Sequence, residues 1–189
     1  MRIGIDIDGV VADTHSTMKK ILEDKGYTFH DESKWFLHDQ SNAPKEVCDE
    51  VVADPETYRN ITPFKYAAAS VRFLVDLGHT PYFVTARTLT HNLVSVTNFW
   101  LRENGFPSER ALIFNPDKAK IAKQFNIAVF LEDSATNAAA LSKVCSVVFL
   151  VDRPHNKYIP WNLEQDRRKI VRVRNVFDTI QYIVDIEAY

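Results

Sequence analysis

The chain has little of what marks secreted, disulfide-bonded or membrane-spanning proteins. Its two cysteines among 189 residues, Cys48 and Cys145, lie far apart and outside any CxxC pair, which favours two reduced thiols. No apolar run is long enough to cross a bilayer. The N-terminus enters the apolar segment 2–5 at once, without the layout of a signal peptide, so we expect a cytoplasmic protein.

The chain also has almost no net charge, no internal repeat and no low-complexity segment. A formal charge of −2 gives no sign of a nucleic-acid or membrane-surface partner. Hydrophobic residues make up 46% and charged residues 25%, which are ordinary proportions for a globular protein with a sizeable core. The length fits one domain with room for a small insertion.

Strand and helix signals alternate in the second half of the chain. Apolar runs predict strands at 81–85, 111–114, 127–131, 146–151 and 170–173, after a first strand that begins at Ile3. Apolar spacing and end signals predict helices at 14–25, 44–53, 64–77, 90–104, 117–125, 135–142 and 176–186, with a break at 54–55. Strands separated by helices imply a parallel sheet covered on both faces.

Two aspartates, Asp6 and Asp8, follow the first strand signal and precede Gly9. Side chains alternate along a strand, so both carboxylates point to the same side if the strand continues through them. They cannot both ionise cheaply unless a cation lies between them. The pair suits a metal ligand or nucleophile combined with a proton carrier. The alternative is a plain Asp-Gly turn in which Asp8 bonds its own backbone.

Polar side chains also stand at the ends of two further predicted strands. Thr85 ends one strand, and Glu132 with Asp133 ends another. Because ligands of parallel sheets bind outside the carboxyl ends of the strands, we expect these groups to join Asp6 and Asp8 in one anionic, metal-assisted site.

A phosphate ester fits the chemistry of such a site. Mg²⁺ is bound by a few carboxylates together with water and phosphate oxygens, and Asp6 and Asp133 are the candidates. The phosphate also needs hydrogen-bond donors and a positive charge. The candidates for these are the Thr85 hydroxyl, the backbone N–H groups of Ala86 and Arg87, and the ammonium group of Lys118 or Lys120.

Four segments resemble, in order, the four motifs of the haloacid dehalogenase (HAD) superfamily. Residues 6–10, Asp-Ile-Asp-Gly-Val, resemble the first motif, and the apolar strand that ends in Thr85 resembles the second. Lys118 resembles the third motif, and the apolar strand that ends in the paired acids at 132–133 resembles the fourth. The match covers most of the chain, and four motifs in order are strongly specific.

The resemblance implies a three-layer, Rossmann-like α/β core with a central parallel sheet, and it implies a role for each site residue. Asp6 would be the nucleophile that forms an aspartyl-phosphate. Asp8 would protonate the leaving oxygen and then deprotonate the attacking water. The Asp6 side chain, the Asp8 carbonyl and Asp133 would hold Mg²⁺, and Thr85 with the Ala86 N–H would hold the phosphoryl oxygens.

The resemblance also implies a lysine that bridges the phosphate and the nucleophile. Counting back from the helix-to-strand junction at 125–127 favours Lys118 over Lys120, with Glu132 as its ion-pair partner. Dehalogenases of the superfamily lack the second aspartate, so Asp8 favours phosphoryl transfer.

The segment 13–63 resembles a small helical cap inserted after the first strand, which leaves 1–12 and 64–189 as the core. Details at 8–13, 84–87 and 152–156 are similar to the 5′-nucleotidase, deoxy (pyrimidine), C-type family, the 5′(3′)-deoxyribonucleotidases and their bacterial and phage relatives. Two positions depart from the pattern of the better-known enzymes. Thr14 replaces an aromatic residue of the cap, and Ala86-Arg87 replaces Ser-Pro.

Two groups in the substrate region each allow two interpretations. Trp35 and Phe36 could stack on a nucleobase, or they could form the core of the cap. Arg87 could bind phosphate through two hydrogen bonds, or it could pair with a nearby acid.

Three further groups are weaker candidates. His15 and His38 could touch the phosphate or the leaving group, but surface or otherwise satisfied histidines are more common. The basic residues between Arg167 and Arg174 could meet a polyanion, but they suit a solvated strand edge better.

The sequence therefore predicts a Mg²⁺-dependent phosphomonoesterase that dephosphorylates (deoxy)nucleoside monophosphates, as a monomer or homodimer. Two alternatives stay open: a HAD phosphatase for another small phosphate ester or a nucleic-acid 3′-phosphate, and a non-catalytic relative that binds a phosphate ligand. A degenerate relative should have lost some of the motif residues, and all five are present: Asp6, Asp8, Thr85, Lys118 and Asp133. The sequence does not select the base, the sugar or the position of the phosphate.

Overall fold

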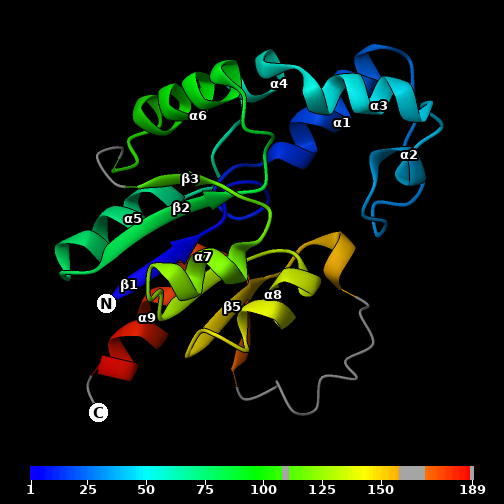
Figure 1. Cartoon of the computed structure of the whole chain (residues 1–189). Coiled ribbons are helices and arrows are strands. Elements are labelled where there is room, and N and C mark those ends of the chain that lie inside the picture. The colour runs from blue at the N-terminus through cyan, green and yellow to red at the C-terminus, as the bar shows by residue number, and fades with distance from the viewer. Residues whose placement is uncertain (108–110, 158–168, 188–189) are drawn as a thin grey trace.

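The computed structural model describes residues 1–107, 111–157 and 169–187 and contains a central six-stranded sheet (Figure 1). Its strands are β1 (Arg2–Ile5), β2 (Thr80–Thr85), β3 (Leu112–Phe114), β4 (Val129–Glu132), β5 (Val147–Val151) and β6 (Ile170–Val173). All neighbouring strands pair in parallel, in the order β3-β2-β1-β4-β5-β6. The predicted α/β class with a central parallel sheet is confirmed.

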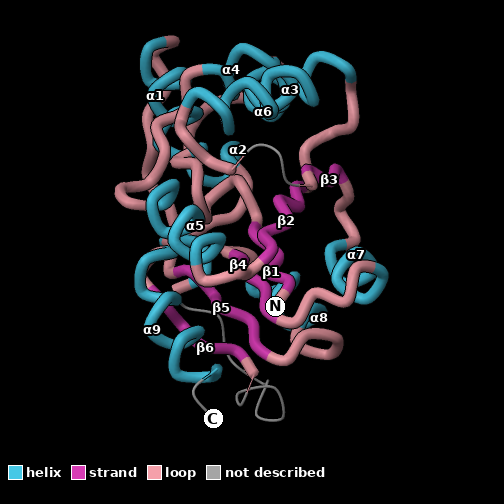
Figure 2. The backbone as a smooth tube through the Cα atoms, turned by 90° about the vertical axis from the view of Figure 1, so that its left-hand side faces the viewer, coloured by secondary structure: helices cyan, strands magenta, loops and turns pink. Residues whose placement is uncertain are grey.

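Helices cover this sheet on both faces. The helices of the described residues are α1 (Thr14–Asp24), α2 (Leu37–Gln40), α3 (Lys45–Ala53), α4 (Pro55–Arg59), α5 (Ala67–Asp76), α6 (His91–Glu103), α7 (Lys118–Gln124), α8 (Ala135–Leu141) and α9 (Val176–Glu187), with a 3₁₀ turn at Pro154–Asn156. Helices α5 and α9 pack together on one face, and α7 and α8 pack together on the other (Figure 1 and Figure 2). In the described part of the chain, no helix is long and apolar enough to cross a membrane.

Both faces of the sheet are buried because side chains alternate along each strand. In β4, Val129 and Leu131 belong to one apolar cluster, whereas Phe130 belongs to the other. In β5, Phe149 and Val148 are divided between the clusters in the same way. Burial on two sides explains why these strands have continuous apolar sequences rather than alternating ones.

Gly4 allows the close approach of the two central strands, β1 and β4. A Cβ atom at this position would lie 2.3 Å from two ring carbons of Phe130. The Phe130 ring is fully buried and has no free space to move into. A side chain at residue 4 would therefore displace the ring or the strand.

The segment 13–63 contributes helices α1–α4 and no strand to the sheet. The chain leaves the core and returns to it at one place. The Asp13 N–H donates to the Thr62 carbonyl at 2.9 Å, and the Phe64 N–H donates to the Val11 carbonyl at 2.9 Å. These helices lie beyond the end of β1 (Figure 1). The division into a core and a cap stays a prediction, which this arrangement supports.

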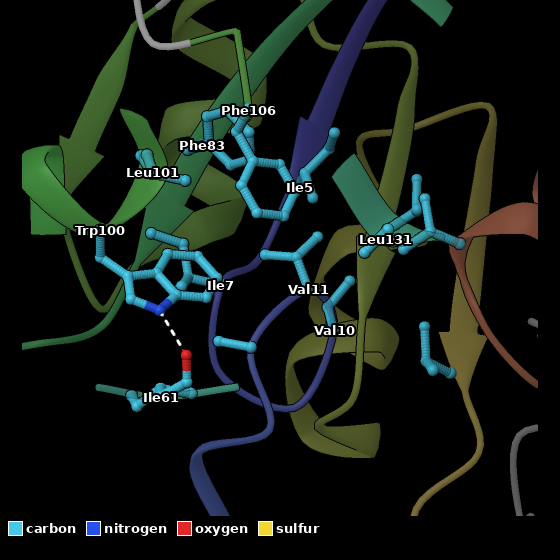
Figure 3. Packing of buried hydrophobic residues seen from close by; sticks show 14 of the residues in the cluster. Ile5, Ile7, Val10, Val11, Ile61, Phe83, Trp100, Leu101, Phe106 and Leu131 are labelled. Atoms are coloured by element: carbon cyan, nitrogen blue, oxygen red, sulfur yellow. Dashed lines mark hydrogen bonds between the residues drawn. The ribbon is translucent and has the colours of Figure 1, made fainter. Parts of the chain in front are cut away.

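Trp100 of α6 contacts the segment where the insertion rejoins the core. Its ring is buried and stacks on Phe106 with the ring centroids 5.3 Å apart. The indole N–H donates to the Ile61 carbonyl at 2.7 Å (Figure 3). Because a buried donor and a buried carbonyl both need partners, this bond fixes the position of the returning chain.

Two helix boundaries add to or differ from the prediction. The break expected at Asp54 and Pro55 is present, because α3 ends at Ala53, but a helix that was not predicted, α4, begins at Pro55. Asp54 accepts the Glu56 N–H, and proline suits the first turn of a helix because its missing N–H is not needed. The helix expected from residue 64 begins instead at Ala67, since Tyr66 adopts a positive φ of 65°.

Replacing Gly4 with alanine is expected to lower the free energy of unfolding by about 1–3 kcal/mol, because overpacking a core forces side chains out of their preferred rotamers. Urea denaturation followed by circular dichroism measures the change. Adding Phe130→Leu should recover part of the loss, since the shorter side chain removes the colliding ring atoms. A Gly4→Ala protein as stable as the wild type would contradict the described packing.

Candidate active site

The candidate site lies where three neighbouring strands end. β1 pairs with β2 on one side and with β4 on the other. Thr85 and Glu132 are the last residues of β2 and β4. β1 ends one residue before Asp6, so the strand does not continue through Asp6 and Asp8. The Asp6 N–H still donates to the Leu131 carbonyl at 3.0 Å, which keeps this backbone beside β4.

Lys118, the first residue of α7, occupies the centre of the site. Its Nζ lies 2.7 Å from Asp6 Oδ2 and 2.7 Å from Glu132 Oε2, and its side chain is 3% exposed. Burial alone would lower the pKa of Lys118, but the two carboxylates outweigh burial and raise it. Lys120 is exposed. The structure places Lys118, and not the exposed Lys120, beside Asp6 and pairs it with Glu132; its role as the lysine of the site stays a prediction.

Three carboxylates surround that lysine. Oxygen atoms of Asp6, Glu132 and Asp133 lie within 4.8 Å of one another, and all three residues are buried. Burial raises the pKa of Asp6 well above its usual value, against the opposing effect of Lys118, and the neighbouring carboxylates raise it further. Burial also raises the pKa of Glu132. Three carboxylates face one ammonium group, so the cluster lacks positive charge.

This donor set fits a hard cation such as Mg²⁺, which takes oxygen ligands from one or two carboxylates. Glu132 is engaged through both oxygens, because Oε2 faces Lys118 and Oε1 accepts the Ser134 N–H at 3.0 Å. Asp6 is engaged in the same way, since its Oδ2 faces Lys118 and its Oδ1 accepts the Ile7 N–H at 2.7 Å, so these contacts do not separate the carboxylates; Asp6 and Asp133 stay the predicted metal ligands.

The turn at Gly9 lies directly against the Asp133 carboxylate. Gly9 has a positive φ of 75°, and a Cβ atom there would lie 1.9 Å from Asp133 Oδ2. Glycine is required here both for the backbone conformation and for the close approach. The backbone of the Asp8-Gly9 turn is thereby next to the predicted metal carboxylate.

Asp8 has a different environment from Asp6. Its Oδ2 accepts Arg87 Nε at 2.8 Å, and its Oδ1 accepts Arg87 NH2 at 2.7 Å. The Thr14 hydroxyl donates to Oδ1, and the Thr85 hydroxyl lies 3.5 Å from Oδ2. Burial opposes ionisation, but Arg87 outweighs it and lowers the pKa of Asp8. The predicted pairing of Arg87 with an acid is confirmed, and its contact with phosphate stays a prediction.

The segment after β5 contacts the site in a way that the sequence did not predict. Arg153 Nε donates to the Gly9 carbonyl at 2.6 Å, and its guanidinium lies 3.9 Å from the centroid of the Phe64 ring. The buried Asn156 side chain donates to the Asp133 carbonyl at 2.7 Å. These contacts fix the backbone around the acidic cluster. The only signal for them was the resemblance of this segment to bacterial relatives.

Trp35 and Phe36 are 54% and 56% exposed, so they do not form a buried core of the inserted segment. The Trp35 ring meets the His155 ring edge-to-face, with the centroids 4.7 Å apart. His155 Nε2 lies 3.3 Å from Asp133 Oδ2. Phe36 stacks on His38 with a centroid distance of 5.3 Å. These contacts bring an exposed indole of the insertion close to the acidic cluster.

The weaker candidates have partners outside the acidic cluster. A ring nitrogen of His15 pairs with the Gln40 side chain. Arg172 of β6 pairs with Asp152, and Arg174, just after β6, pairs with Asp178 of α9. Among the described strands β6 lies at an edge of the sheet, as expected for these basic residues. Residues 167–168 of the predicted basic run lie outside the described residues.

Two solved structures of similar fold are hydrolases of the HAD superfamily. A HAD family hydrolase from Deinococcus radiodurans, determined with bound phosphate and sodium, matches with a TM-score of 0.62 and 16% identity over 97% of this chain and 94% of that chain. A haloacid dehalogenase-like hydrolase from Streptococcus pneumoniae matches with a TM-score of 0.59 and 11% identity over 96% and 97%. The chain therefore has the Rossmann-like fold of HAD hydrolases.

The sequence defines the family more narrowly. Residues 1–183 match the family described as 5′ nucleotidase, deoxy (pyrimidine), cytosolic type C, and the chain belongs to this family. A nucleotidase of Clostridium acetobutylicum is 28% identical over 98% of this chain and 94% of its own length. Family and fold together make the chain a phosphoric monoester hydrolase of the nucleotidase kind, which confirms the predicted class of enzyme.

Replacing Lys118 with methionine is expected to lower the free energy of unfolding by about 3–5 kcal/mol at neutral pH, because Asp6 and Glu132 lose their buried positive partner. The matched control is Lys120→Met, an exposed substitution that should change stability by less than about 0.5 kcal/mol. Urea denaturation of both variants measures the difference. Equal stability of the two variants would contradict the central place of Lys118.

Proposed function

We propose that the protein is a Mg²⁺-dependent phosphomonoesterase that hydrolyses (deoxy)nucleoside monophosphates through an aspartyl-phosphate on Asp6. The observation that carries the proposal is the buried ion pair of Asp6 and Lys118, with Asp133 beside it. The family match supports a nucleotide substrate. The phosphate held by a HAD hydrolase of the same fold supports a phosphate site in this architecture.

The proposed reaction consists of two displacements at phosphorus. In the first, an Asp6 oxygen bonds to phosphorus, the bond to the ester oxygen breaks, and that oxygen takes a proton from Asp8. In the second, Asp8 takes a proton from water, the water oxygen bonds to phosphorus, and phosphate leaves Asp6. Both aspartates end as they began. A proton carrier of this kind accelerates a reaction by about 10²–10⁴-fold.

Neighbouring groups are proposed to hold the phosphoryl group and the metal. The Lys118 ammonium, the Thr85 hydroxyl and the Ala86 N–H would donate to the phosphoryl oxygens. The proposed Mg²⁺ ligands are the carboxylates of Asp6 and Asp133 and the carbonyl of Asp8. When bound, the ion would supply the positive charge that three carboxylates and a phosphate group lack.

The inserted segment is proposed to recognise the nucleoside. Trp35 is exposed and contacts His155, which lies beside Asp133, so a base stacked on the indole would lie near the phosphate site. Phe36 offers a second exposed ring next to it. Aromatic faces stack on any nucleobase, which suits a nucleotide better than a phosphate ester without a base.

We also propose a cytoplasmic location and a monomeric or homodimeric state. Cys48 and Cys145 are free and buried, and burial raises the pKa of both thiols. Unreactive, reduced thiols suit a reducing compartment.

Phosphate release from a panel of monophosphate esters, with Mg²⁺ or with a chelator, tests the proposed function. The panel holds deoxyribonucleotides, ribonucleotides, a sugar phosphate and a 3′-phosphorylated oligonucleotide. We expect Mg²⁺-dependent release that is fastest from deoxyribonucleoside monophosphates. Fastest release from the sugar phosphate or the oligonucleotide would overturn the nucleotide assignment, and release that persists in the chelator would overturn the metal dependence.

Two variants serve as controls for the panel. Asp6→Asn should fold and lose turnover on every member, because an amide cannot act as the nucleophile. Asp24→Asn, at an exposed position of α1, should keep it. Wild-type-like turnover by Asp6→Asn would refute the assignment of the nucleophile.

Trp35→Ala is expected to raise KM for a nucleoside monophosphate by about 5- to 150-fold, which corresponds to a lost stacking contact of about 1–3 kcal/mol. The effect on glycerol phosphate, which has no base, should be much smaller. Steady-state kinetics on both substrates measures the difference, with Phe177→Ala, an exposed aromatic of α9, as the matched control. Equal effects of Trp35→Ala on the two substrates would argue against stacking.

A further inference from the structure

We infer that Arg87 is a positioning residue for Asp8 and fixes the direction in which this carboxylate meets the leaving oxygen. The inference rests on the proposed function, because Arg87 has this role only if Asp8 carries the proton. The sequence alone allowed two roles for Arg87, either binding phosphate or pairing with an acid, and did not choose between them.

The contact between the two side chains is bidentate. Two parallel bonds of 2.8 Å and 2.7 Å, from Arg87 Nε and NH2, reach the two oxygens of Asp8. Such a pair fixes the plane of a carboxylate as well as its distance. The Arg87 side chain is 2% exposed and the Asp8 side chain 31% exposed, so the arginine end of the pair is shielded from water. A lysine in its place would offer a point charge without the fork geometry.

Arg87 is itself held by two helices. Its NH1 donates to the Thr97 hydroxyl oxygen at 2.9 Å, and that hydroxyl donates to the Leu93 carbonyl at 2.6 Å within α6. On the other side, the guanidinium lies 4.3 Å from the centroid of the Tyr58 ring in α4. A core helix and a helix of the inserted segment thus fix the same guanidinium.

Asp8 needs such a partner because its backbone does not fix its side chain. The residue lies beyond the end of β1, next to the turn at Gly9. A proton carrier must come within hydrogen-bond distance of the leaving oxygen. Misplacement by about 1 Å can slow an enzyme by about 10²-fold. The bidentate contact, together with the Thr14 hydroxyl on Oδ1, supplies the direction that the turn leaves open.

A direct contact with phosphate is a weaker account of Arg87. Each of its three guanidinium nitrogens already donates to the protein, two to Asp8 and one to Thr97. Only two of its five N–H groups are left over, and the side chain that carries them is 2% exposed, which leaves little room for a phosphate. Lys118, within the acidic cluster, is already the proposed donor to the phosphoryl oxygens.

A double-mutant cycle on a deoxyribonucleoside monophosphate tests whether Arg87 acts through Asp8. Arg87→Met should lower kcat by about 10- to 100-fold and change KM by less than about threefold. In an Asp8→Asn background, the same substitution should have little further effect, because the group that it positions is already gone. Losses that multiply in the double variant would overturn the inference.

The nature of the leaving group gives a second, independent readout. p-Nitrophenyl phosphate releases a stabilised phenolate that needs no proton, whereas a nucleotide releases a poor alkoxide. Arg87→Met should therefore lower kcat/KM, which reports the steps up to departure of the leaving group, at least about tenfold more for the nucleotide than for the aryl ester. Equal losses of kcat/KM on both esters would overturn the inference in favour of a structural or phosphate-binding role.

Two further variants keep this test decisive. Arg102→Met, at an exposed arginine of α6, is the control and should leave both activities unchanged. Thr97→Val removes the hydroxyl that accepts from Arg87 NH1, and it should lower activity on the nucleotide selectively, but less than Arg87→Met does. If Arg87→Met does not fold, the same comparison is made with Thr97→Val. A wild type that hydrolyses neither ester would refute the proposed function, whereas wild-type activity with unselective losses would refute only the role of Arg87.

Discussion

The concentration of carboxylates at one edge of a parallel sheet, offset by one buried lysine, is the interaction on which the rest of the site depends. β1 and β4 are neighbours, so the acids that follow them meet at their carboxyl ends. Burying ionised carboxylates is unfavourable unless they are paired. Lys118 pairs with Asp6 and Glu132, and the remaining deficit of positive charge is what suits this edge to a cation and a phosphate ester.

The surroundings of Asp6 and Asp8, two residues apart, push their pKa values in opposite directions. Asp6 is buried among carboxylates, which raises its pKa, whereas Arg87 lowers the pKa of Asp8. Without a bound cation these directions are opposite to the proposed roles, because a nucleophile must be ionised and a proton donor protonated; a cation beside Asp6 would lower its pKa. The inserted segment takes part in both environments, because Tyr58 lies on Arg87 and Trp35 reaches His155 beside the acidic cluster.

Much of the fold and of the acidic cluster could be predicted because the information is local in the sequence. Apolar runs predict buried strands, and polar residues at their ends share one edge of a parallel sheet, which placed Asp6, Thr85 and the acids at 132–133 together; Lys118 was placed beside them by the family resemblance. The remainder depends on contacts between distant segments. No periodicity reveals that Arg87 lies on Asp8 or that Trp35 stays exposed, and a proline such as Pro55 begins a helix or breaks one according to the residue that caps it.

The central claim is that Asp6 forms a covalent bond with phosphorus. Protein quenched in acid during turnover of a nucleoside monophosphate with a radioactive phosphate group, and then digested, tests this most directly. If Asp6 is the nucleophile, we expect the label on the peptide that contains Asp6 and no label on Asp6→Asn. Hydroxylamine should release the label, as expected for an acyl phosphate. Label on another residue, or label retained by Asp6→Asn, would contradict the central claim.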